Sequence, residues 1–451
     1  MIFSQLSKWF STVLITTLLV GIVISFSLLI YDIDQKNITE NNSRFTITSS
    51  YYIDETNTIT LNSVLNDVNF TDSDLNAIPY ALAKQSYWIK LSLHYPIGEI
   101  SRSTSENQQI LMKNNHNEPV ILMAEHSRLE TFTIYELNAL TPPTVIYNKQ
   151  LVLEDLNQQI SPYARLQLNQ FGHSEYLIQL KNSGPPNIPL LLFTAQDFEQ
   201  RQMLSQLVYG AFIGILIIMA IYNLVLFFAG KDKVYLLYIG YLISAFVVLS
   251  SLTGYGYFLF SNQVMQLFNQ YLIFADFLLI AFLLLFTLYY LRYDRLKHWA
   301  YKCSLIVAGI LILCAFYSLV LDELAQTKLF FSLQPVFYIV ALFLIFNRLK
   351  HDFSWARFYF LSWLPLLIGA VIQPMVLLNK LEYSFLTANA FLFGIMIEVT
   401  FMAFALADRI RRNEQEKLTM IAYHQSNHLP RQTNLDHKIS QILEADNQDF
   451  T

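Results

Sequence analysis

The sequence predicts a membrane protein in two parts, an all-β sandwich outside the cytoplasm followed by a bundle of seven transmembrane helices. Three observations support this prediction. Only 14% of the 451 residues are charged and 54% are apolar, whereas soluble domains carry roughly 25% charged residues. From residue 205 onward, long apolar runs follow one another closely. Residues 37–200 instead show short runs in which apolar and polar side chains alternate.

The first 31 residues contain an apolar run, Trp9–Ile30, that is long enough to cross a bilayer. Lys8 precedes it and no A-x-A cleavage site follows. Segment 1–31 is therefore predicted to be an uncleaved N-terminal anchor. The alternative is a cleaved signal peptide, for which Ser25–Ser27 is a weak small-x-small match.

Residues 205–407 are predicted to form seven spans, because a helix needs about 20 apolar residues to cross the hydrocarbon core. The predicted spans are Leu207–Ala229, Val234–Leu252, Phe268–Leu291, Cys303–Leu321, Lys328–Asn347, Phe358–Leu378 and Phe385–Ala407.

Basic residues in the short loops predict the orientation of the bundle. Alternate loops and the stretch after the last span contain 13 lysines and arginines, and the intervening loops contain one, Lys380. By the positive-inside rule the lysine- and arginine-rich side is cytoplasmic. The sequence therefore predicts a multi-pass membrane protein, with residues 37–200 outside the cytoplasm and the tail 408–451 inside it.

Residues 37–200 are predicted to fold as an antiparallel β-sandwich with one polar face. In "SYWIKLSLHY" the apolar Tyr87, Ile89 and Leu91 alternate with Trp88 and Lys90, the period-two pattern of a half-buried strand. On the polar-alternating face, Trp88 and Lys90 are candidate ligand contacts, since an indole ring can stack on a sugar or another small molecule. The alternative is that Trp88 packs beneath a loop. The segment Leu61–Val68 is predicted to be a short helix.

Several stretches together resemble the bacterial 7TM receptors with diverse intracellular signalling modules (7TMR-DISM). The stretch "SYWIKLSL" is similar to a tryptophan-containing strand of that family and "SRLETFTIYEL" to a later strand. "GILIIMAIYNLVLFFAGKDKVYLLYIGYLI" resembles its first two spans, and "FLFGIMIEVTFMAFALADRIR" its seventh span with the charged exit. The resemblance implies an outer sensory domain of jelly-roll type, a carbohydrate-like or other small ligand, and a cytoplasmic output module. It also implies a bacterial inner membrane, with residues 37–200 in the periplasm and the tail in the cytoplasm.

The tail 408–451 is predicted to continue the seventh span as a helix into the cytoplasm. Arg409, Arg411 and Arg412 are expected to hold it at the anionic inner leaflet. A broken heptad of apolar residues on this helix predicts a homodimer. Residues 421–439 resemble the opening of a GGDEF domain, although several positions depart from that pattern and the stretch ends before any nucleotide-binding or catalytic residue. The alternative is an ordinary polar helix pair.

Four polar residues within the predicted spans are candidates for a conformational switch: Glu398, Asp276, Asn223 and Gln373. Intramembrane ionisable residues are costly and mark function by default. They also support the alternative class, a multispan transporter, but the chain has no internal repeat of the kind that transporters use.

The sequence favours a receptor that senses a ligand outside the cytoplasm and transmits a conformational change through seven helices to an absent or truncated output module. It contains no G-x-x-x-x-G-K, H-E-x-x-H or G-x-S-x-G motif, so no enzymatic activity is predicted for this chain. Cofactors, metal ions and nucleic acids are not expected as partners. The expected partners are the lipid bilayer, the small ligand and a second copy of the chain.

Overall fold

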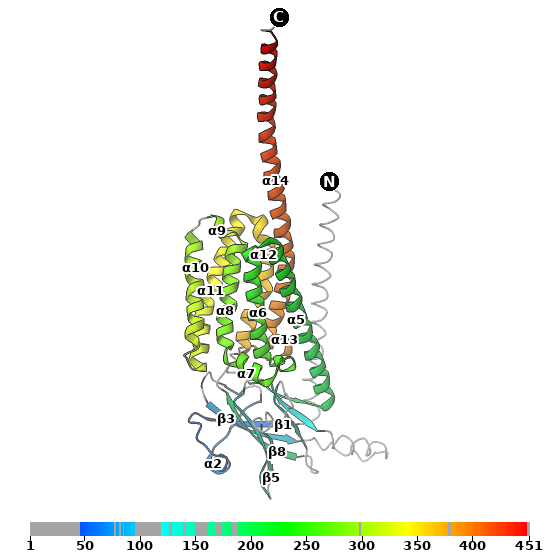
Figure 1. Ribbon diagram of the computed structural model, residues 1–451. Helices are drawn as coiled ribbons and strands as arrows, with labels where there is room; N and C mark the ends of the chain where they lie inside the picture. The colour runs from blue at the N-terminus through cyan, green and yellow to red at the C-terminus, as the bar shows by residue number, and fades with distance from the viewer. Residues whose placement is uncertain are drawn as a thin grey trace, which may run out of the picture.

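The computed structural model describes residues 46–448, apart from 76–77, 81–82, 84, 95–118, 126–128, 139–140, 149–160, 168–172, 183–187, 297–298 and 378–379. The predicted N-terminal segment 1–31 lies outside the described residues. Figure 1 shows the strands at one end of a helical bundle, and α14 leaving the bundle at the other end. We call these the sheet end and the exit end.

The described strands form two antiparallel sheets. The six-stranded sheet has the order β2-β1-β3-β8-β5-β6, and the three-stranded sheet has the order β7-β4-β9. The strands are β1 (Thr46–Asp54), β2 (Thr71–Asp72), β3 (Gln85–His94), β4 (Val120–Ala124), β5 (Thr131–Asn138), β6 (Thr141–Asn148), β7 (Tyr163–Leu166), β8 (His173–Asn182) and β9 (Leu190–Phe193).

The two sheets share one hydrophobic core. Ile89 of β3 pairs with Ile178 of β8, which pairs with Ile134 of β5, and all three side chains are fully buried. They pack in one cluster with Leu122 of β4 and Leu192 of β9 from the other sheet. The alternation in the sequence therefore predicted the inward-facing residues correctly, because successive side chains of a strand point to opposite faces.

The helices follow in chain order and include the predicted seven spans. They are α2 (Leu61–Asp67), α5 (Ala195–Gly230), α6 (Lys233–Thr253), the 3-10 helix η1 (Tyr255–Phe258), α7 (Asn262–Gln270), α8 (Leu272–Tyr290), α9 (Tyr293–Leu296), α10 (Trp299–Ser318), α11 (Glu323–His351), α12 (Phe353–Leu377), α13 (Phe385–Ala388) and α14 (Ala390–Gln448). Among the described residues, seven of these helices are long and apolar enough to cross a membrane. The predicted fold class, a β region followed by a seven-helix bundle, is confirmed, as is the short helix near Leu61.

Two predicted spans start later than the sequence suggested. The third span begins at Leu272 rather than Phe268, because the preceding residues form the separate helix α7, which ends at Gln270. The polar residues of α7 make it amphipathic rather than membrane-spanning. The seventh span begins at Ala390 rather than Phe385, since Asn389 leaves the helical conformation and its amide donates to the carbonyl of Phe385.

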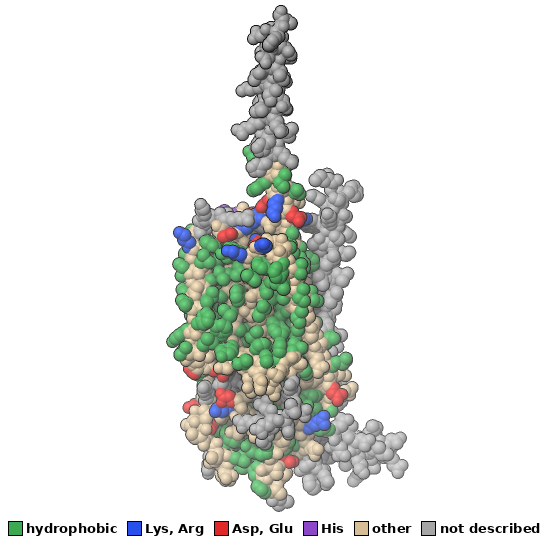
Figure 2. Space-filling view, viewed as in Figure 1, with side chains coloured by type: hydrophobic (Ala, Val, Ile, Leu, Met, Phe, Trp, Pro, Cys, Tyr) green, Lys and Arg blue, Asp and Glu red, His purple; other side chains and the backbone are tan. Residues whose placement is uncertain are grey.

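The surface of the bundle has the polarity that a bilayer requires. Figure 2 shows a broad band of hydrophobic side chains across the visible face of the bundle, with lysines and arginines gathered at the exit end. Helix α14 has 59 residues; at 1.5 Å per residue it is roughly 90 Å long, about three times the thickness of the hydrocarbon core. It therefore spans the bundle and extends well beyond it.

Helices α12 and α14 approach each other at two glycines. A Cβ added to Gly394 would lie 2.7 Å from the carbonyl oxygen of Pro365, and one added to Gly369 would collide with the carbonyl of Ala390. Small residues at such crossings allow the two backbones to come close, which is how helices pack tightly within membranes.

We predict that Gly394→Ala separates α12 from α14 and lowers the free energy of unfolding by about 1–3 kcal/mol, the usual cost of overpacking. Gly309→Ala in α10 is the matched control, because a Cβ there meets nothing within 4 Å. In that position alanine should be neutral or stabilising. Unfolding in lipid nanodiscs measures both variants, and equal stabilities would show that the close crossing does not matter.

A second prediction concerns Asp54, at the end of β1. Its carboxylate accepts hydrogen bonds from the hydroxyl and N–H of Thr56 and from the N–H groups of Asn57 and Ile59. Burial acts to raise the pKa of Asp54, but these hydrogen bonds outweigh it and hold the pKa below its ordinary value.

A lowered pKa means that Asp54 stabilises the fold at neutral pH, and that this stabilisation is lost as the pH falls through the lowered value. Asp54→Asn should therefore lower the melting temperature of the outer domain at pH 7 and weaken its dependence on acid pH. Asp72→Asn, at an exposed position of β2, is the control. If the melting temperature of Asp54→Asn fell at acid pH as steeply as that of the parent, the lowered pKa of Asp54 would not be the cause of the acid sensitivity.

Candidate functional site

The sheet region and the bundle meet at Arg201, two turns into α5. A single residue, Thr194, separates β9 from α5, and its hydroxyl accepts a hydrogen bond from the N–H of Asp197 as an N-cap. Arg201 is 7% exposed, and its Nη2 lies 2.7 Å from Oε2 of Glu125, which follows β4. Its guanidinium group also lies over the rings of Phe193 in β9 and Phe385 in α13, 5.4 Å from each centroid. Arg201 thus contacts both sheet and bundle.

Aromatic residues close the junction around this ion pair. Burial, and then the negative charge of Glu125, raise the pKa of the Tyr383 hydroxyl well above its ordinary value, so this group stays neutral. Tyr209 of α5 stacks on Tyr255 and donates a hydrogen bond to Oδ1 of Asn389. Asn389 immediately precedes α14. The junction therefore connects the sheet region, through α5, to the first turn of α14.

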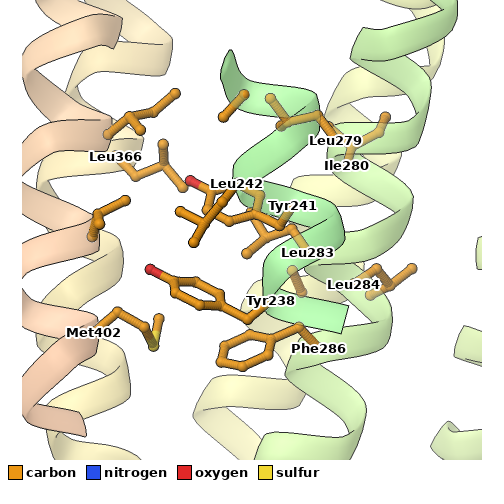
Figure 3. Packing of buried hydrophobic residues seen from close by; sticks show 14 of the residues in the cluster. Tyr238, Tyr241, Leu242, Leu279, Ile280, Leu283, Leu284, Phe286, Leu366 and Met402 are labelled. Carbon is orange, nitrogen blue, oxygen red and sulfur yellow. The ribbon is translucent and has the colours of Figure 1, made fainter. Parts of the chain in front are cut away.

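In the middle of the bundle, Glu398 of α14 is fully buried. The hydroxyl of Tyr241 in α6 donates to Oε2 of Glu398 across 2.9 Å. Figure 3 shows Tyr238 and Tyr241 extending from α6 toward the helix that carries Met402. The amide of Asn223, another switch candidate from the sequence, donates to the carbonyl of Met219 in its own helix.

At the exit end, two ion pairs hold α14 against the loops of the bundle. Nη2 of Arg409 lies 3.0 Å from Oδ2 of Asp232, the N-cap of α6. Arg292, in the turn after α8, donates to both carboxylate oxygens of Glu416 across 2.9 Å and to Oδ1 of Asn413. Arg292 adopts φ 59, a left-handed conformation that is uncommon for a residue with a side chain.

The three arginines expected at the inner leaflet differ in environment. Arg409 is only 5% exposed, and its guanidinium lies over the ring of Tyr290 inside the bundle. The carboxylate of Asp232 and the ring of Tyr290 contact this guanidinium, and its expected role at the inner leaflet stays a prediction. Arg411 and Arg412 both pair with Asp408 on the same helix, and of the two Arg411 is exposed.

The remaining candidates lie apart from this chain of contacts. Trp88 is buried against Val64 and Leu177 on the outward face of the six-stranded sheet, and Lys90 forms a 3.1 Å ion pair with Glu175 at the same face. Asp276 is half-buried in α8. Gln373 is half-buried in α12, and its Oε1 has no hydrogen-bond partner among the described residues. The roles assigned to these four residues stay predictions.

Sequence reasoning missed most of the junction and the exit-end ion pairs. Arg201 and Glu125 are 76 residues apart, and Arg292 and Glu416 are 124 apart, so no local pattern connects the partners. The one available signal was the presence of charged residues at both ends of apolar helices. Across the described residues, no group of three histidine, cysteine or acidic side chains is arranged to hold a metal ion.

The comparison with known families agrees with the helical region. Residues 205–409 match the family model 7TMR-DISM_7TM, described as 7TM diverse intracellular signalling. The match begins within α5 and ends within α14, so it covers all seven spans. No curated protein matches the chain. The match and the seven apolar helices support a membrane sensory receptor. The stretch 421–439 lies beyond the matched residues, so its resemblance to a GGDEF domain stays a prediction.

We predict that Glu125 and Arg201 are coupled by about 1–3 kcal/mol in a double-mutant cycle of Glu125→Gln and Arg201→Ala, because both charges are largely desolvated. The exposed pair of Glu130 and Lys181, with side chains 37% and 36% exposed, should give about 0–1 kcal/mol. Unfolding in nanodiscs measures both cycles. Additive effects at Glu125 and Arg201 would mean that the pair does not join the sheet region to the bundle.

Proposed function

We propose that the chain is a bacterial inner-membrane receptor that binds a small ligand outside the cytoplasm and transmits a change in α14 to a cytoplasmic output. The observation that carries this proposal is the series of contacts along α14. One uninterrupted helix meets the junction at its first turn, Tyr241 in the middle and two ion pairs at the exit end. A change at the sheet end can therefore reach the tail without crossing a flexible loop.

The distribution of charge supports the proposed orientation. Basic residues lie where the helices end on that side: Lys231 is the C-cap of α5, Arg292 lies between α8 and α9, and Lys350 is in the last turn of α11. Figure 1 shows the sheet at the opposite end of the bundle. The positive-inside rule then assigns the sheet region to the periplasm and the tail to the cytoplasm.

A receptor of this kind works by shifting the populations of two bundle arrangements, and a ligand shifts them only by its differential affinity. The ion pairs of Arg292 and Arg409 hold α14 in one arrangement relative to α6 and α8. In the second arrangement, we propose, α14 moves along or about its axis and exchanges these partners. Displacements of one helix by 1–2 Å are a common form of such transitions.

Glu398 is the proposed switch residue within the membrane. An ionised carboxylate facing lipid costs about 2.5–3.5 kcal/mol on insertion scales, but Glu398 faces α6 and accepts from Tyr241. A hydrogen bond in this position has few competitors, because lipid offers none. It therefore favours one rotation and depth of α14 relative to α6.

The finer features rest on the resemblance and the sequence. We propose a carbohydrate-like or other small ligand for the outer domain, with Trp88 and Lys90 as contacts, and a homodimer joined through the extended part of α14. The GGDEF-like stretch 421–439 is the candidate start of the output module.

An epistasis experiment tests transmission without requiring the ligand. With an output enzyme fused to the end of α14, Arg201→Ala should change the output of the parent chain, because it releases the junction. Glu398→Leu should fix the output, so that Arg201→Ala has no further effect. Glu398→Gln, which can still accept from Tyr241, is the matched control and should preserve the response. Equal effects of Arg201→Ala in all three backgrounds, at normal expression, would contradict the proposal.

A further inference from the structure

The outward face of the six-stranded sheet is covered by α2 where the aromatic residues lie. Trp88 of β3 pairs with Gln179 of β8, which pairs with Thr133 of β5, so the three residues form a row on that face. Val64 of α2 is buried together with Trp88 and Leu177. The indole ring of Trp88 is also stacked on Tyr135, with centroids 6.4 Å apart. Trp88 is therefore buried by α2 and not by the second sheet.

Helix α2 is held in place weakly for an element that covers so much of the face. It has seven residues, its N-cap Thr60 makes no side-chain capping bond, and neither terminal turn carries a charge that favours the helix dipole. Its apolar contacts with the sheet are the buried Val64 and the partly buried Leu61, whereas Leu65 is 41% exposed. Because isolated helices this short are unstable in water, α2 keeps its shape only while it is docked.

The contact between α2 and the sheet leaves one polar group unsatisfied. Nε1 of Trp88 is buried and has no hydrogen-bond partner among the described residues, which costs free energy relative to a partnered donor. The preceding turn is firmly attached, since Asp54 accepts from the backbone of that turn and the hydroxyl of Ser86 donates to the side chain of Asn57. The turn before α2 is therefore fixed by hydrogen bonds that do not involve the helix itself.

We propose that α2 is a displaceable cover over the ligand site of the receptor, and that the ligand takes its place on Trp88 and Tyr135. This inference rests on the proposed function. The ligand must present a flat apolar face to the two rings and an acceptor atom to Nε1 of Trp88. Lys90 and Glu175 at the rim neutralise each other, so the site suits an uncharged molecule. Release of α2 exposes the face that carries Trp88.

The test uses the full chain in nanodiscs, labelled with 5-fluorotryptophan, with the Trp88 resonance assigned from its loss in Trp88→Phe. Val64→Asp should detach α2 and Val64→Ala should loosen it. The difference in the chemical shift of the Trp88 fluorine between H2O and D2O reports its exposure to solvent. This difference should be smallest in the parent, larger in Val64→Ala and largest in Val64→Asp. Leu65→Asp is the matched control, because this neighbouring side chain is exposed, and it should leave the resonance unchanged.

The variants also test the site itself. A set of uncharged cyclic polyol and aromatic amide fragments should shift the Trp88 resonance in Val64→Asp more than in the parent, and should leave the other tryptophan resonances unchanged. The proposal that α2 is a displaceable cover fails if the Trp88 resonance is unchanged in Val64→Asp. It also fails if the whole outer domain unfolds in both Val64 variants. Absence of any fragment effect in Val64→Asp would overturn the ligand site. None of these readouts depends on transmission through α14, so failure of the receptor proposal would appear separately.

Discussion

The hydrogen bond between Tyr241 and Glu398 shows the constraint on which the rest of the bundle depends. Lipid offers no hydrogen-bond partners, so a polar group in a span must find its partner within its own helix or on a neighbouring one, and Glu398 of α14 finds Tyr241 on α6. That requirement fixes α14 relative to α6 in both rotation and depth. The backbone contact at Gly394 holds α14 against α12, and the ion pairs of Arg409 and Arg292 fix it at the exit end. Movement of α14 therefore requires an exchange of partners at several levels, which favours discrete states over gradual deformation.

The sheet region is joined to this helix through a short connection around Arg201 and Tyr209. The junction around Arg201 uses an ion pair and two aromatic faces, which keep their geometry better than flexible apolar contacts would. The pair is also largely removed from water, so breaking it leaves a charge without its partner and is costly. Contacts of this kind suit a receptor that must transmit small displacements, because a flexible junction would deform and not pass them on.

Much of the architecture could be predicted from the sequence, and the reasons are physical. Seven apolar runs and a charge bias in the loops identify the spans, and the alternation around Ile89 identifies the face that becomes the core. The start of the third span was misplaced, because the apolar Phe268 belongs to the amphipathic α7. The partners of Glu398 and Arg201 could not be predicted, since they come from helices and strands brought together only by the fold. Trp88 shows the same limit: alternation placed it on the outward face, but the cover that buries it is a separate segment.

Transmission through α14 is tested most directly by measuring whether a change at the sheet end moves the part of α14 that leaves the bundle. The native cysteines are first removed by Cys303→Ser and Cys314→Ser. Spin labels attached at Lys350→Cys and Lys417→Cys then report the distance between the end of α11 and α14 in nanodiscs. We expect Arg201→Ala and Glu125→Gln each to shift this distance distribution, whereas Lys181→Ala, in an exposed ion pair of the sheet, should leave it unchanged. Identical distributions in all of these folded proteins would contradict transmission through α14.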